Sequence, residues 1–93
     1  MGLTKYFIYS ILRTMNILVL SQEKTLFEGE AAGFNAKTRV GEITILDHHQ
    51  PLISILERGI GKILKKDGTR EELEIAGGFL EMNKKNELRV LVD

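Results

Sequence analysis

The chain has 93 residues, among them 13 Lys and Arg, 13 Asp and Glu and no Cys, so its formal net charge is zero. This length allows one small domain with a single core. The balanced charge argues against a nucleic-acid-binding protein and against a polybasic membrane anchor. Disulfides and thiolate metal sites are excluded, and no apolar stretch approaches the ~20 residues that a membrane-spanning helix needs. Any membrane association must therefore come through a partner.

Residues 1–14 differ in composition from the rest of the chain. A short apolar run, Tyr6 to Leu12, lies between Lys5 and Arg13 and superficially resembles the hydrophobic part of a signal peptide. No cleavage site of small residues follows it. We consider three interpretations of this extension: the product of an upstream start codon, a helix or strand packed on the domain, or a targeting segment. The domain itself is predicted to span residues 15–93.

Strand and turn signals then recur every eight to twelve residues, which is the spacing of a β-sandwich or barrel. Residues 17–20 form an apolar run that is typical of a strand covered on both faces. After a polar turn at 21–24, a second strand is expected to run from Leu26 toward Ala36.

The middle of the chain continues this pattern. Apolar residues alternate through 43–45, and a polar loop at 47–50 precedes Pro51, which cannot donate to a β-ladder and so marks the edge or start of a strand. Extended structure is predicted to resume at 52–56 and again, after a turn, at 60–64.

The last third contains the clearest turn signals. Asp67-Gly68 predicts a hairpin with a type I′ turn, because this pair suits two positive φ angles. Apolar and acidic residues alternate through 72–75, and Gly77-Gly78 indicates a bulge or a close backbone approach. A final strand at 88–92 closes the chain. The sequence therefore predicts an all-β fold, an antiparallel β-sandwich or flattened barrel of about ten short strands in two sheets.

One group of residues invites a chemical interpretation. Asp47, His48 and His49 are zinc ligands by type, which raises the hypothesis of a metal-dependent enzyme built around the two histidines. Adjacent side chains in extended structure point to opposite faces, however, and no third ligand is marked by the sequence. The pattern favours a solvated loop pair, so we predict no catalytic residue, no metal site and no cofactor.

Apolar surface exceeds what one small core can hide. Two segments, 17–20 and 52–56, are apolar on both alternating faces, which indicates an interface with a partner. Phe27 and Phe79 could each fill the core or face that partner.

Several motifs resemble, in order and spacing, the N-terminal β-sandwich domain of the epsilon subunit of rotary (F-type) ATP synthases, which is called delta in mitochondria. The resemblance covers residues 15–93. The segments that carry it are Leu20 to Glu30, Gly41-Glu42, His49-Gln50-Pro51-Leu52, Gly59, Lys65 to Gly68, Gly77 to Glu81 and Val90 to Asp93. The chain departs from the family at Asp47-His48, where Pro-Gly is usual, at Thr44, where a small residue is usual, and along 31–40, which lacks the usual Pro-Gly turn.

The resemblance implies a sandwich of two five-stranded sheets with no catalytic activity. It implies a central-stalk subunit that clamps the gamma subunit onto the c-ring, at the cytoplasmic face of the bacterial inner membrane or the equivalent organelle face. Gly41, Glu42 and His49 match the family's ring-facing loops, and Gly77 and Gly78 are structural glycines. Family members commonly continue into a C-terminal helical hairpin, which this sequence does not contain, so its inhibitory role is not carried over. The alternative is an unrelated small β-sandwich that binds another protein.

Overall fold

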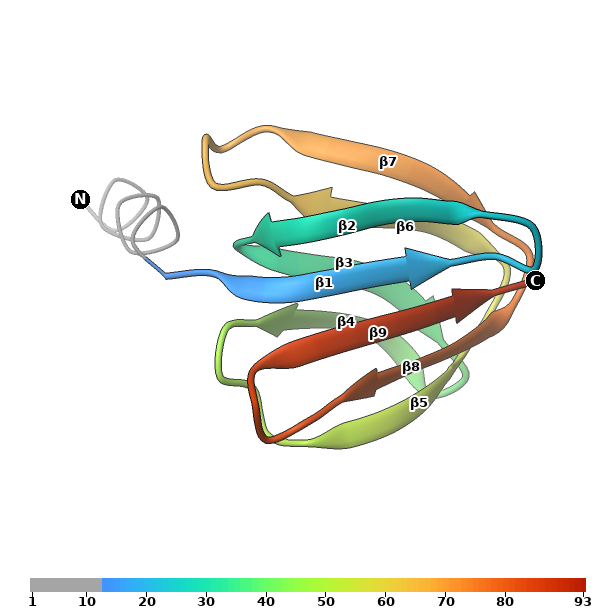
Figure 1. The fold of residues 1–93 in the computed structure, drawn as a ribbon. Helices are drawn as coiled ribbons and strands as arrows, with labels where there is room; N and C mark the ends of the chain where they lie inside the picture. The colour runs from blue at the N-terminus through green and yellow to red at the C-terminus, as the bar shows by residue number, and fades with distance from the viewer. Residues whose placement is uncertain (1–12) are drawn as a thin grey trace.

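The computed structural model describes residues 13–93, and the predicted extension at 1–14 lies almost wholly outside them. The described part has no helix and nine strands (Figure 1), so the predicted all-β class is confirmed. The strands are β1 (Met15–Leu20), β2 (Thr25–Ala31), β3 (Gly33–Thr38), β4 (Gly41–Leu46), β5 (Leu52–Leu56), β6 (Gly59–Leu64), β7 (Arg70–Ile75), β8 (Gly78–Met82) and β9 (Glu87–Val92).

The strands form two layers of one curled sheet. A five-stranded layer has the order β2-β1-β9-β8-β5, and a four-stranded layer has the order β7-β6-β3-β4. A single residue pair, Thr38 with Leu56, joins β3 to β5 where the sheet turns from one layer into the other. The second strand predicted from Leu26 to Ala36 is therefore two strands, because the chain changes layers at Ala32, whose N–H donates to Leu64 O at 2.7 Å.

One pair of neighbouring strands is parallel, which differs from the expected wholly antiparallel sheet. β1 and β9 pair in parallel from Asn16 with Glu87 to Leu20 with Leu91, and the other pairs in residues 13–93 are antiparallel. These two strands come from opposite ends of the chain, and their arrows point the same way in Figure 1.

The core lies between the layers and follows the alternation of the strands. On β1, Ile17 and Val19 are buried while Leu18 is only half-buried, because successive side chains of a strand point to opposite faces. Phe34 is the largest fully buried side chain. The core cluster also contains Met15, Ile17, Val19, Ala31, Ala36, Ile45, Leu56, Ile63, Ile75, Leu80, Met82, Leu88, Val90 and Val92.

The hairpin between β6 and β7 is real, but its predicted type I′ turn is wrong. Only Gly68 has a positive φ, of 88°, and Asp67 does not. The turn is closed by Gly68 N–H donating to Lys65 O and by Lys65 N–H donating to Thr69 O. Asp67 instead accepts hydrogen bonds from the N–H and the hydroxyl of Thr69, at 2.9 and 2.6 Å, and this local bonding favours a longer loop over the tight turn.

Gly78 lies where β8 comes against β9. Its φ is 134°, and a Cβ at this position would collide with Leu91 O. Gly77 has a φ of 158°, and a Cβ there would lie 2.7 Å from the Asp93 carboxylate. A glycine at 78 thus allows the backbone approach that sets Phe79 beside Leu91.

Candidate functional site

The outer face of the five-stranded layer carries a continuous row of apolar side chains. Strand register places Leu20 beside Leu91, Leu91 beside Phe79, and Phe79 beside Ile55. Paired residues share a face of the sheet, so these four side chains cross the strands β1, β9, β8 and β5. We call this row the apolar stripe.

The apolar stripe is open to solvent. The exposed fractions are 44% for Phe79, 47% for Ile55 and 37% for Leu91, and Ile53, two residues before Ile55, is 71% exposed. A depression of about 250 Å³ lies at one end of the stripe, lined by Leu20, Gln22, Phe79 and Leu91 among others. A contiguous exposed apolar patch of this kind marks a protein-binding site more often than scattered single side chains do.

The two phenylalanines that the sequence left open have different positions. Phe27 on β2 is half-buried and packs against the core cluster, so it fills the core. Phe79 points away from the core, while its neighbour Leu80 is fully buried. The exposed apolar surface of this layer therefore lies on β5, as predicted for 52–56, and on β8 and β9, whereas Leu18 and Leu20 of the predicted segment 17–20 are half-buried.

The outer face of the four-stranded layer has a different character, and we call it the polar face. Here Lys37 pairs with Glu42, Asn35 pairs with Thr44 and Lys62, and Lys62 pairs with Glu72. The Asn35 amide donates to the Glu42 carboxylate at 3.0 Å and to the Thr44 hydroxyl at 2.8 Å. Its exposed apolar side chains, Leu46 and Ile60, lie in different rows.

Gly41 and Glu42 begin β4 and follow the tight turn at 39–40. The turn is held by the Thr38 hydroxyl, which donates to Gly41 O at 2.6 Å and accepts from Val40 N–H at 3.3 Å. Gly41 has a φ of 127° and open space around it, and Glu42 is exposed. The turn at 57–58 lies next to it, because Glu57 N–H donates to Lys37 O. We call this end of the sandwich the Glu42 end.

His49 lies at the opposite end of β4, in the loop 47–51, which we call the His49 loop. Its N–H donates to Leu46 O at 3.1 Å, and its ring Nδ1 lies 2.9 Å from Gln50 O. A six-residue strand is roughly 20 Å long, so Glu42 and His49 lie at opposite ends of β4 rather than side by side. The structure thus does not bring the predicted ring-facing residues together. They bracket β4, whose only partner strand within residues 13–93 is β3.

The rings of His48 and His49 make separate contacts. The His48 ring contacts Asp47 at 3.1 Å, whereas the His49 ring contacts a backbone carbonyl. In residues 13–93, no three His, Cys, Asp or Glu side chains are arranged to hold a metal ion.

Among these residues no helix is long and apolar enough to cross a membrane.

Sequence reasoning missed Asn86, which connects the His49 loop to two other segments. It lies in the turn between β8 and β9, its side chain contacts residues 38 and 72 positions away, and its φ is 62°. Only the Asn in a polar turn hinted at it, since Asn adopts positive φ more readily than most residues.

Comparison with known proteins covers nearly all of the described chain. Residues 14–93 match the family model described as the ATP synthase delta/epsilon chain, beta-sandwich domain. The chain is 36% identical over 77 residues to the ATP synthase epsilon chain of Dichelobacter nodosus, which covers 83% of this chain and 53% of that one.

Two solved structures share the fold. A chain in the cryo-EM structure of the Euglena gracilis mitochondrial ATP synthase, comprising OSCP, F1 and c-ring in rotational state 1, matches with a TM-score of 0.82 at 20% identity, over 86% of this chain and 51% of that one. A chain in the central stalk and c-ring structure of the Tetrahymena thermophila mitochondrial ATP synthase matches with a TM-score of 0.72 at 17% identity, over 84% of this chain and 62% of that one.

The present chain thus spans about half the length of the curated relative that it matches. Within that span, the nine-stranded curled sheet, the ordered motifs and the family model agree. The chain belongs to the delta/epsilon family of ATP synthase subunits, and residues 14–93 are its β-sandwich domain.

Proposed function

We propose that this chain is the β-sandwich part of a central-stalk subunit of a rotary ATP synthase. It clamps the gamma subunit onto the c-ring, so that rotation driven by protons or sodium ions is transmitted to the catalytic head. It has no catalytic role of its own. Family membership supports the proposal, and the similar solved structures come from assemblies that contain a c-ring or a central stalk.

The apolar stripe is the observation that carries this proposal. A monomeric domain gains nothing from exposing Phe79, Ile55 and Leu91 side by side, whereas a permanent subunit interface is apolar at its centre. The polar face offers no equivalent row. We therefore assign the gamma subunit to the outer face of the five-stranded layer.

The ring contact is proposed for the open edge of β4. Gly41 and Glu42 lie at one end of this strand and His49 follows the other end, so a contact along the strand reaches all three residues. Exposed Glu42 and a titratable His49 are suited to pair with charged groups on the polar loops of the ring.

The proposed location follows from the complex rather than from the chain itself. As part of an ATP synthase, the subunit is membrane-associated only through its partners, at the cytoplasmic face of the bacterial inner membrane or the equivalent organelle face. The relatedness to a bacterial epsilon chain supports this location.

Co-purification with the gamma subunit from the same source tests the gamma contact. Size-exclusion chromatography with light scattering should show a one-to-one complex. If the chain is folded but elutes alone at micromolar concentration, the fold is shared without the function, and the alternative of an unrelated protein-binding module is favoured.

Single cysteines test the ring contact, because the chain has no Cys of its own. We would place them at Glu42, at Thr44 in the middle of β4, and at His49, and measure crosslinking to the c-ring in the assembled enzyme. A contact along the β4 edge predicts crosslinks from all three positions. Crosslinks from one end only would show that the domain stands on the ring by that end.

A further inference from the structure

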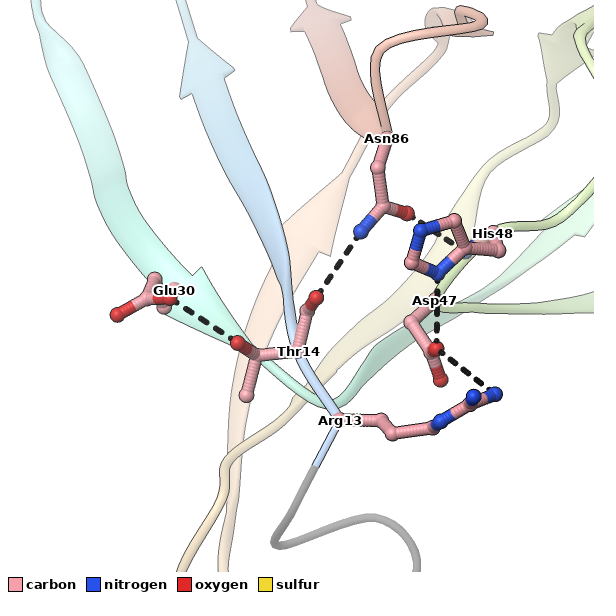
Figure 2. Close-up of polar contacts among 6 residues, drawn as sticks. All are labelled: Arg13, Thr14, Glu30, Asp47, His48 and Asn86. Atoms are coloured by element: carbon pink, nitrogen blue, oxygen red, sulfur yellow. Dashed lines mark hydrogen bonds and ion pairs between the residues drawn. The ribbon is translucent and has the colours of Figure 1, made fainter.

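A small polar network joins three distant parts of the chain at the His49 end of the sandwich (Figure 2). Asn86, between β8 and β9, accepts a hydrogen bond from His48 N–H through Oδ1 at 2.6 Å, and its amide donates to Thr14 O at 3.0 Å. Asn16 N–H donates to the backbone carbonyl of Asn86 at 3.2 Å. The start of β1, the His49 loop and the turn between β8 and β9 are therefore held together by one residue.

The backbone conformation of both partners is unusual. Within residues 13–93, His48 and Asn86 are the non-glycine residues with positive φ, at 58° and 62°. Such conformations are uncommon outside glycine and persist where the surroundings hold them. His48 and Asn86 are hydrogen-bonded to each other, so this bond helps to hold both residues in their positive-φ conformations.

The side chain of Asp47 adds a second restraint on the same loop. It is almost fully buried, with 5% of its surface exposed, and its Oδ2 lies 3.1 Å from His48 Nδ1 and 3.9 Å from the Arg13 guanidinium (Figure 2). The contact with Asp47 restrains the orientation of the His48 ring. His49, the next residue, is left half-buried with its ring against Gln50 O.

We propose that Asn86 is a positioning residue for His49: by holding His48 against the start of β1, it fixes the direction in which the His49 loop is presented. The structural half of this inference stands on the contacts above. Its functional half, that the presented loop meets the c-ring, rests on the proposed function.

The decisive variant is Asn86→Gly, which keeps the positive φ accessible and removes both side-chain hydrogen bonds. Its matched control is Asn83→Gly in the same turn. Asn83 accepts from Lys85 N–H and Glu87 N–H and donates to the Glu87 carboxylate, so it makes more hydrogen bonds than Asn86 but none to the His49 loop.

In the isolated full chain, amide hydrogen exchange and the NMR resonances of the His49 ring report the order of the loop. Asn86→Gly should speed exchange at the His48 amide about tenfold, the factor that one hydrogen bond is worth in an equilibrium constant, and should shift the His49 ring resonances. Asn83→Gly should leave both unchanged. Equal effects of the two variants, or no effect of Asn86→Gly, would overturn the proposal.

A conservative variant separates the two bonds of Asn86. Asn86→Asp retains an acceptor for His48 N–H but has no donor for Thr14 O. We expect His48 to keep its protection while the His49 ring resonances shift partway. Full wild-type behaviour would show that the link to β1 is irrelevant and would contradict the positioning role.

In the assembled enzyme, the readout is the crosslinking yield from a cysteine at His49. Asn86→Gly should lower this yield several-fold and leave the yield from a cysteine at Glu42 unchanged, whereas Asn83→Gly should alter neither. If the cysteine at His49 does not crosslink even with Asn86 present, the proposed ring contact of this loop fails. The positioning role is then decided by the exchange and ring resonances of the isolated chain.

Discussion

The two outer faces of this sandwich are built by the same rule and carry opposite chemistry. Each layer alternates, with one side chain in the core and the next in solvent, yet the five-stranded layer presents Leu91, Phe79 and Ile55 in a row while the four-stranded layer presents Lys37, Glu42 and other polar groups. Alternation explains every inward apolar residue and no outward one. Packing of the core therefore does not account for the apolar stripe, and we attribute the stripe to binding of a partner.

Adjacent residues on β8 give the largest expected effect on stability. Leu80→Ala empties a fully buried site and should lower the free energy of unfolding by about 2 to 5 kcal/mol. Phe79→Ala should change the free energy of unfolding by less than about 1 kcal/mol. It should nevertheless lower the affinity for gamma about tenfold or more, as expected of an interface anchor. Urea unfolding and titration with gamma measure the two quantities, and a destabilised Phe79→Ala variant would mean that this side chain belongs to the core.

A pair of glycines in the five-stranded layer gives the next effect. Gly78→Ala brings a Cβ into Leu91 O and should cost roughly 2 to 3 kcal/mol. Gly29 also has a positive φ, of 150°, but a Cβ at this position would meet nothing within 4 Å. Gly29→Ala therefore strains only the backbone conformation and should lower the free energy of unfolding by about 1 kcal/mol. Equal losses in thermal unfolding would show that conformation, not the approach of β8 to β9, decides the need for glycine.

On the polar face, Asn35→Ala sharpens the contrast. The substitution removes the bonds to Glu42 and Thr44 and should destabilise the domain by about 1 kcal/mol. Binding to gamma should be unchanged, because this face points away from the apolar stripe. A weaker complex at unchanged stability would indicate that gamma binds the four-stranded layer instead.

The smallest effect concerns the hairpin between β6 and β7. The hydrogen bonds from the Thr69 hydroxyl and N–H hold the pKa of Asp67 below its ordinary value of 3.8. A depressed folded-state pKa contributes stability above pH 3.8 that is lost as the pH falls through the folded pKa. Thr69→Val removes the hydroxyl, so an NMR titration should find the Asp67 pKa raised toward 3.8. An unchanged pKa would mean that the backbone bond alone is sufficient.

Much of the fold could be predicted from the sequence because strand signals are local. Alternation through 72–75, the apolar run at 17–20 and the largely apolar segment 52–56 each indicated a strand, and they are β7, β1 and β5. The change of layer at Ala32 could not be predicted, since it depends on a hydrogen bond to Leu64 across the sheet. The prediction of a type I′ turn was wrong because the Asp67 side chain accepts hydrogen bonds from the N–H and the hydroxyl of Thr69, which favours a longer loop.

The candidate site was harder to predict, for a physical reason. The sequence indicated surplus apolar surface, but only strand register shows that Ile55, Phe79 and Leu91 are neighbours. Likewise, Glu42 and His49 are seven positions apart, and it takes the direction of β4 to show that they lie at opposite ends. The role of Asn86 depends on contacts 38 and 72 residues away, which no local pattern contains.

Two exposed isoleucines on opposite faces of the sandwich allow a direct test of where gamma binds. Ile55 is 47% exposed in the apolar stripe, and Ile60 is 45% exposed on the polar face. We would compare Ile55→Asp with Ile60→Asp for binding to the cognate gamma subunit by size-exclusion chromatography with light scattering, after confirming that both variants are folded. We expect Ile55→Asp to abolish the complex and Ile60→Asp to leave it intact. A complex that survives Ile55→Asp but is lost with Ile60→Asp would contradict it.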